Sequence, residues 1–370
     1  RRQRQMCIRD SQKEYIASIT GLILNVVSYL AIILLVTWEQ NYLLALGIGT
    51  VTEVVLNIWI SWYVEQKYPF LRQRRKEKST SSLTKRIVRD LKSLFISRIS
   101  EKMLYCTDNL IISGFIGVGT VGRYANYCMI TQAISNILTI LANTIQPTVG
   151  DYFTEKNRQR NYEILRQLTF GFFCIASVVS VGLFSLITPF VRDIWLGPSY
   201  ELGWGITVFC IVVLLVRIMG LPLSLVMGVT GLFEKEKNVG ASSALLNLIV
   251  SLALVKPYGM AGVLLGTLLS YLLQILYRYI IYFRDFLEMP GEALRYAQDI
   301  GEYLAVIAGE VLLMQKIVPL IYGAGGMLLF CVCFLLCIAI PLLLDLVIFG
   351  RGWSPDSYTH LRPHETSAHL

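Results

Sequence analysis

Charged residues are scarce in this sequence. They make up 16% of its 370 residues, against about 25% in a typical soluble protein. Hydrophobic residues reach 55%, and the mean hydropathy is +0.57. This composition excludes an ordinary water-soluble domain and indicates a protein embedded in a lipid bilayer.

Histidine occurs three times, always near the C-terminus, as His360, His364 and His369. Residues 1–11 and 354–370 share no pattern with the sequence between them, and both resemble translated sequencing-adapter sequence. We expect an artefactual leader and tail around a truncated natural protein, with genuine polar tails as the alternative. The body between them has no histidine, which excludes histidine-based acid–base catalysis and imidazole metal ligands there.

Cysteine chemistry has little support. The seven cysteines of the body lie in apolar runs, where cysteine usually acts as a small hydrophobic side chain. No CxxC pair or metal-ligand spacing occurs, so we expect no metal site and no cofactor.

Long apolar runs make up most of the sequence. A helix needs about 20 apolar residues to cross the hydrocarbon core of a membrane. Ten such runs follow one another, at about 18–37, 43–64, 94–117, 123–145, 167–190, 204–230, 239–256, 260–282, 299–319 and 325–349. They predict an all-α polytopic membrane protein with about ten transmembrane helices.

Basic residues cluster in alternate loops, which predicts the orientation. Twenty lie on one side, and four lie on the other, Arg123, Arg192, Lys256 and Lys316. Because basic loops stay in the cytoplasm, we expect a multi-pass membrane protein with these loops on the cytoplasmic side. Residues 65–93 form the longest polar stretch and are expected to be a cytoplasmic basic linker, which can also attract anionic lipids.

The third apolar run carries a polar stripe. At 100° per residue, the side chains of Arg98, Lys102, Tyr105 and Asn109 fall within about 40° of one another on a helix. Ionisable groups inside a membrane usually face a cavity or a partner. The stripe is therefore a candidate substrate pathway.

Alternative roles remain open for these residues. Glu101 and Asp108 flank the stripe, where they are candidates for ion coupling or for charge pairing with the basic residues. Arg98 and Glu101 have the spacing of an intrahelical ion pair, and Arg98 and Lys102 lie near enough to the cytoplasmic end to extend towards water.

Arg217 is the most isolated cation inside an apolar run, and it is followed by Gly220 and Pro222. A proline there permits a kink or hinge. Arg217 is a candidate cavity cation, or else the structural partner of an acid. Four further residues are weaker candidates for a role in transport, and structural pairing is the alternative for each. They are Glu53, Glu302, Glu310 and Lys316.

Several sequence strings resemble one transporter family. The stretch at 86–126 has a DNLIISGF segment starting at Asp108 and a GRYAN turn at Gly122–Asn126, and QKEYI, QKYPFL and GVTGLFEKEKN occur elsewhere. These strings resemble polysaccharide-type flippases of the multidrug, oligosaccharidyl-lipid and polysaccharide exporter superfamily. The resemblance covers nearly all of the body, although its motifs are helix-end patterns rather than a catalytic signature.

The resemblance implies a fold of fourteen helices in two six-helix bundles and a terminal pair, of which this chain would hold helices five to fourteen. The expected parts are two helices of the N-terminal bundle at 12–64, the linker at 65–93, a C-terminal bundle at 94–284 and the terminal pair at 285–353. A fragment without the first four helices is not expected to transport.

The implied activity is transport rather than catalysis. The substrate would be a polyprenyl-diphosphate-linked oligosaccharide repeat unit, exported by alternating access between the bundles for surface polysaccharide synthesis. Arg98, Lys102 and Arg217 are the residues expected to meet the diphosphate. Arg123 would do so on the far side or be an exposed loop charge.

Other partners and activities follow from the same resemblance. Membrane lipids and polysaccharide polymerase machinery are implied partners, and no nucleic acid is. A drug or cation exporter of the same superfamily is one alternative, although the basic stripe argues against it. A polytopic polymerase or glycosyltransferase is another, although no outside loop longer than the one at 191–203 is expected.

Overall fold

The computed structural model describes residues 14–39, 42–67, 95, 99, 103, 106–153, 157–230, 232–323 and 325–349. All regular elements in these ranges are helices. The chain forms two compact units, divided between Ser81 and Ser82, and each is considered by itself.

The first unit contains helices α2 (Glu14–Glu39) and α3 (Tyr42–Lys67), which pack against each other. The Thr52 hydroxyl on α3 donates a hydrogen bond to Ser28 Oγ on α2, over 3.0 Å. Large apolar side chains such as Leu22 and Leu34 are exposed. Such a surface suits contact with lipid rather than with water.

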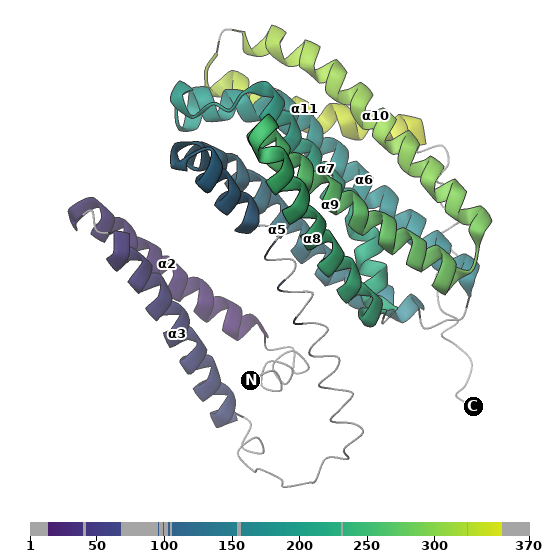
Figure 1. Cartoon of the computed structure of the whole chain (residues 1–370), viewed down its shortest axis with the longest axis horizontal. Coiled ribbons are helices and arrows are strands. Elements are labelled where there is room, and N and C mark those ends of the chain that lie inside the picture. Colours follow the sequence, from purple (N-terminus) through teal and green to yellow (C-terminus); the bar gives the residue numbers. More distant parts are fainter. Residues whose placement is uncertain are drawn as a thin grey trace, which may run out of the picture. The chain divides into compact units, whose positions relative to one another are not determined.

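The described part of the second unit begins with the single helical positions 95, 99 and 103 and continues with a helical stretch at 106–115. The long helices that follow are α5 (Val118–Phe153), α6 (Arg158–Pro189), α7 (Trp204–Val229), α8 (Phe233–Tyr258), α9 (Met260–Ile280), α10 (Pro290–Tyr322) and α11 (Met327–Phe349). Helices α5 to α9 run alongside one another, and α10 lies on the outer side (Figure 1). Short π-helical segments extend α6 to Trp195 and α9 to Leu287.

Eight helices of the described residues are long and apolar enough to cross a membrane. Their candidate membrane-crossing stretches start at Thr20, Val118, Arg158, Trp204, Asn238, Met260, Pro290 and Met327. Each overlaps one of the ten predicted spans, and α3 covers the predicted span at 43–64 as a helix of 26 residues. Of the predicted span at 94–117, the structure describes positions 95, 99, 103 and 106–117. The chain is therefore a multi-pass helical membrane protein.

The helix ends that the sequence assigned to the basic side lie together in the second unit. A cluster of buried side chains joins the start of α6, the end of α7, the start of α8 and the start of α10, and it includes Tyr162, Val226, Val239, Tyr282 and Tyr296. The opposite ends meet in a second cluster around Tyr127, Val191, Ile211 and Val263. The helices thus alternate in direction as the charge pattern requires.

The predicted turn at Gly122–Asn126 is wrong. The chain turns instead at Ile116 and Gly117, and α5 begins at Val118, so Arg123 lies within a helix rather than in a loop. Gly117 has φ of +128°, a conformation that favours glycine, and it supplies the break. The Asn126 amide donates to the Gly122 carbonyl over 3.1 Å and is accommodated in the helix.

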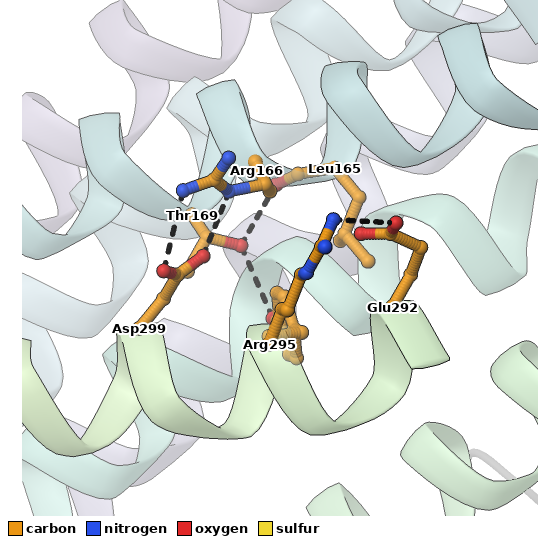
Figure 2. A network of polar contacts seen from close by, with 7 residues as sticks. Leu165, Arg166, Thr169, Glu292, Arg295 and Asp299 are labelled. Carbon is orange, nitrogen blue, oxygen red and sulfur yellow. Dashed lines mark hydrogen bonds and ion pairs between the residues drawn. The ribbon is translucent and has the colours of Figure 1, made fainter. Parts of the chain in front are cut away.

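The terminal pair α10 and α11 packs against α6. Phe173, Tyr303 and Phe349, one from each helix, meet in an aromatic cluster. Figure 2 shows a polar clamp at the start of the same interface, in which Arg166 on α6 forms two hydrogen bonds to Asp299 on α10, of 2.7 and 3.2 Å.

Candidate functional site

A buried polar centre around Asp108 connects three helices of the second unit. The Thr267 hydroxyl on α9 donates to Asp108 Oδ2 over 2.7 Å, and Asn247 Nδ2 on α8 lies 2.9 Å from Thr267 Oγ1 and 3.5 Å from Asp108 Oδ1. Asp108 is 5% exposed, and Asn247 is fully buried. Polar groups removed from solvent in this way must bond one another.

Small residues let α8 and α9 approach closely enough to form this centre. Ser243, Asn247 and Ser251 recur every four residues on α8 and are fully buried. A Cβ atom added at Gly262 on α9 would clash with the Leu254 backbone, and one added at Gly266 would meet Ser251. Such stripes of small residues allow transmembrane helices to pack with their backbones in close contact.

Two further groups complete the centre. The Thr107 hydroxyl lies 3.2 Å from Asn247 Oδ1, and Ser251 Oγ donates to the Val263 carbonyl over 3.2 Å. The cluster therefore gathers carboxylate, amide, hydroxyl and carbonyl oxygens in one buried region. Oxygen atoms of these kinds are the ligands that hard cations prefer.

The charge of the centre limits what it can bind. Asp108 supplies one negative charge, and Asn247 and the hydroxyl groups are neutral. A single carboxylate in a low-dielectric region is neutralised by one positive charge. One proton or one small monovalent cation would therefore balance the charge of the centre. Groups of three or more His, Cys, Asp or Glu side chains that could hold a metal ion are absent from the described residues.

The predicted stripe is described at a single position. Asn109 is exposed, on a different face of the helix from buried Asp108. Arg98, Glu101, Lys102 and Tyr105 lie outside the described residues, so the stripe stays a prediction.

Arg217 lies in the middle of α7 and is partly buried. Its guanidinium carbon lies 5.4 Å from the centre of the Tyr271 ring on α9, in a cation–π arrangement. Helix α7 continues through Pro222 to Val229, so the proline does not end the helix. The two roles considered for Arg217 both remain open.

Arg123 is exposed on the second turn of α5. Two roles were predicted for Arg123, contact with the diphosphate and an exposed loop charge. Its position agrees with an exposed charge, although the charge lies on a helix and not in a loop.

Most partners of Asp108 do not stand out in the sequence. Asn247 and Thr267 are uncharged residues on separate apolar helices, 139 and 159 positions away. The recurrence of Ser243, Asn247 and Ser251 at helical spacing, opposite a Gly-x-x-x-Gly pattern at Gly262 and Gly266, is the signal that could have paired the two helices.

Comparisons with known proteins agree with this architecture. Residues 8–153 match a family described as "Polysaccharide biosynthesis protein". The whole fold resembles the solved structure of the lipid II flippase MurJ in an inward closed conformation, with a TM-score of 0.62 and 16% sequence identity, over 93% of this chain and 69% of that chain.

No curated protein matches the chain. The family match begins within the expected leader at 1–11 and ends with α5, so the boundaries of the expected parts stay predictions. The family match and the fold together support the resemblance found in the sequence: residues 8–153 match polysaccharide biosynthesis proteins, and the chain has the fold of the MurJ flippase.

Proposed function

We propose that the protein is a non-enzymatic transporter that exports a polyprenyl-diphosphate-linked oligosaccharide repeat unit across the bacterial cytoplasmic membrane by alternating access. The main support is the flippase fold shared with MurJ over 93% of the chain, combined with the match to polysaccharide biosynthesis proteins. MurJ is a flippase of lipid II, which is a lipid-linked substrate. Membrane lipids and polysaccharide polymerase machinery are the partners that we propose with this activity.

The Asp108 centre is the proposed coupling site. A buried carboxylate hydrogen-bonded to Thr267 and Asn247 suits reversible binding of a monovalent cation, because rotation of the Asn247 amide would present its oxygen in place of its nitrogen. The helices that supply these residues would then pack more tightly when the cation is bound than when it is absent. The cation would therefore bind the tightly packed conformation with higher affinity, and a difference in affinity between two conformations couples a ligand to a conformational change.

Substrate contact is proposed for the basic residues. Arg217, placed inside α7 beside Tyr271, has the planar guanidinium that suits a diphosphate. Arg98, Lys102, Tyr105 and Asn109 are proposed to continue this pathway towards the cytoplasm, and Arg123 stays a weaker candidate at the far end.

Orientation follows the charge pattern. The start of α6 carries Arg158, Arg160 and Arg166, and the start of α10 carries Arg295. These ends lie together in the second unit, and we propose that they face the cytoplasm.

Genetic complementation tests the proposal. The complete gene that encodes this chain is expressed in a bacterium that lacks its own repeat-unit flippase, and surface polysaccharide is measured at matched protein levels. The proposal expects polysaccharide to be restored, and to be lost when Arg98 and Arg217 are both replaced by alanine. Resistance to cationic drugs without polysaccharide would favour the drug exporter instead.

A further inference from the structure

A second group of buried acids lies far from Asp108, where the terminal pair meets α6. Glu310 on α10 is 3% exposed, and Asp345 on α11 is 1% exposed. The two carboxyl groups lie beside each other and beside the Ser177 hydroxyl of α6. The Ser177 hydroxyl donates to Glu310 Oε2 over 2.5 Å.

Three carboxyl oxygens of this pair lack a hydrogen-bond partner. They are Glu310 Oε1 and both oxygens of Asp345. An ionised carboxylate with no partner is costly in an apolar interior. The aspartate side chain is therefore almost completely enclosed, directed at the glutamate and unsatisfied, which distinguishes this group from an ordinary surface cluster of acids.

In the described residues, neither acid forms an ion pair with a basic side chain of the surrounding helices. Cys174 of α6 lies near both acids, Tyr303 of α10 lies near Cys174, and Cys337 shares the buried stripe of α11 with Asp345. The basic residues closest in sequence on α6 and α10 are Arg166, which binds Asp299, and Lys316, which is exposed. None of these groups can neutralise two carboxylates.

A single proton satisfies both the charge and the hydrogen bonding of the pair. Two adjacent carboxylates repel each other when both are ionised. If one carboxyl group keeps its proton, its O–H can donate to an oxygen of the other, and one negative charge is removed. The arrangement requires no ligand larger than a hydrogen ion.

We propose that Ser177, Glu310 and Asp345 form a proton-binding site in which the two carboxyl groups share one proton and so hold α10 and α11 against α6. Loss of the proton places two negative charges at this interface and weakens it. The site is separate from the Asp108 centre, and the proposal does not depend on which substrate is transported.

Labelling of the unmodified protein tests the proposal directly. Dicyclohexylcarbodiimide reacts with protonated carboxyl groups in apolar surroundings, and the modified residue is identified by mass spectrometry. The 370-residue chain in lipid nanodiscs should be labelled at Glu310 or Asp345 at neutral pH, and labelling should decline as the pH is raised. Exposed Glu302 on the same helix should stay unlabelled and is the internal control.

Two results would overturn the proposal. One is the absence of label at both acids at neutral and mildly acidic pH, although the same residues react in the denatured protein at acidic pH. The other is protection of the pair by sodium but not by choline at constant ionic strength, because this would identify a metal cation as the ligand.

Variants give an independent readout. In the double variant Glu310→Gln, Asp345→Asn, the thermal stability should no longer fall between neutral and alkaline pH, whereas the unmodified protein and Glu302→Gln should lose stability. An unchanged pH dependence in the double variant contradicts the proposal. If this variant does not fold, the labelling of the unmodified protein still decides.

Discussion

The Thr267 hydroxyl lies 2.7 Å from Asp108 Oδ2, although the two residues are 159 positions apart in the sequence. The same hydroxyl oxygen lies 2.9 Å from Asn247 Nδ2. Thr267 thus acts as donor to the carboxylate and acceptor from the amide, and it fixes the relative positions of three helices. A change in the charge of Asp108 therefore alters its hydrogen bonds to both α8 and α9.

Replacement of Asp108 by asparagine should abolish stabilisation by cations. In the unmodified protein, a monovalent cation at 100 times its Kd adds about 2.7 kcal/mol to the stability of the folded state. The variant lacks the negative charge, so its thermal stability should be the same in sodium chloride and in choline chloride. Thermal denaturation in detergent micelles measures the difference.

The matched control is Glu163→Gln, which neutralises an exposed acid on α6. It should keep the full cation response. An equal cation response in Asp108→Asn and in the unmodified protein would show that the ligand binds elsewhere.

Replacement of Thr267 by valine should destabilise the centre without changing its volume. The substitution removes the hydroxyl, so Asp108 Oδ2 loses its donor and the Asn247 amide keeps only its 3.5 Å contact to Asp108 Oδ1, at a cost of about 1–3 kcal/mol. Thr267→Ser keeps the hydroxyl and should retain most of the stability and the cation response. The prediction fails if valine and serine variants denature at the same temperature.

Replacement of Gly262 by alanine should separate α8 from α9. The added methyl group would meet the Leu254 backbone, which cannot move aside as a flexible side chain can. Overpacking of this kind costs about 1–3 kcal/mol. Gly301 on α10 has open space around its Cα, so Gly301→Ala should be neutral or slightly stabilising. Thermal denaturation of the two variants side by side tests the difference.

The sequence was sufficient to predict the membrane helices and their alternation. Eight of the described helices have an apolar stretch long enough to cross a bilayer, and hydrophobic length depends on neighbouring residues alone. The turn before α5 lies at Ile116 and Gly117, whereas the resemblance placed a turn at Gly122–Asn126. Gly117 and Gly122 are both glycines in similar surroundings, and only the backbone conformation of Gly117 distinguishes them.

The candidate site was much less predictable than the fold. Asp108 stood out because a charge in an apolar run is costly. Its partners Asn247 and Thr267 are ordinary polar residues of other helices, and their contact depends on how α8 and α9 pack. Asp345 lies between apolar residues near the end of the last span, so the sequence does not reveal that it meets Glu310.

Replacement of Arg166 or Asp299 by alanine should weaken the contact between α6 and the start of α10. Arg166 and Asp299 form two parallel hydrogen bonds across the α6–α10 interface (Figure 2). Their side chains are 50% and 19% exposed, so the pair is expected to contribute about 0.5–1 kcal/mol. A double-mutant cycle with Arg166→Ala and Asp299→Ala measures this coupling in thermal stability. A coupling energy of zero would show that the contact between Arg166 and Asp299 does not stabilise the protein.

Replacement of Arg217 by alanine should reduce transport more than stability. If the guanidinium binds the diphosphate, Arg217→Lys keeps the charge but loses the planar pair of donors, so it should retain part of the activity. Surface polysaccharide in the complemented strain should therefore decrease in the order unmodified protein, lysine variant, alanine variant, at equal protein levels.

Two further variants separate substrate binding from a structural role of Arg217. Tyr271→Phe keeps the aromatic ring under the guanidinium and should leave transport nearly unchanged, whereas Tyr271→Leu removes the ring and should reduce transport. Lys316→Gln removes an exposed charge of α10 and is the control for net charge. A parallel loss of polysaccharide and of folded protein in Arg217→Ala would assign this residue to the packing of α7 against α9 instead of to the substrate.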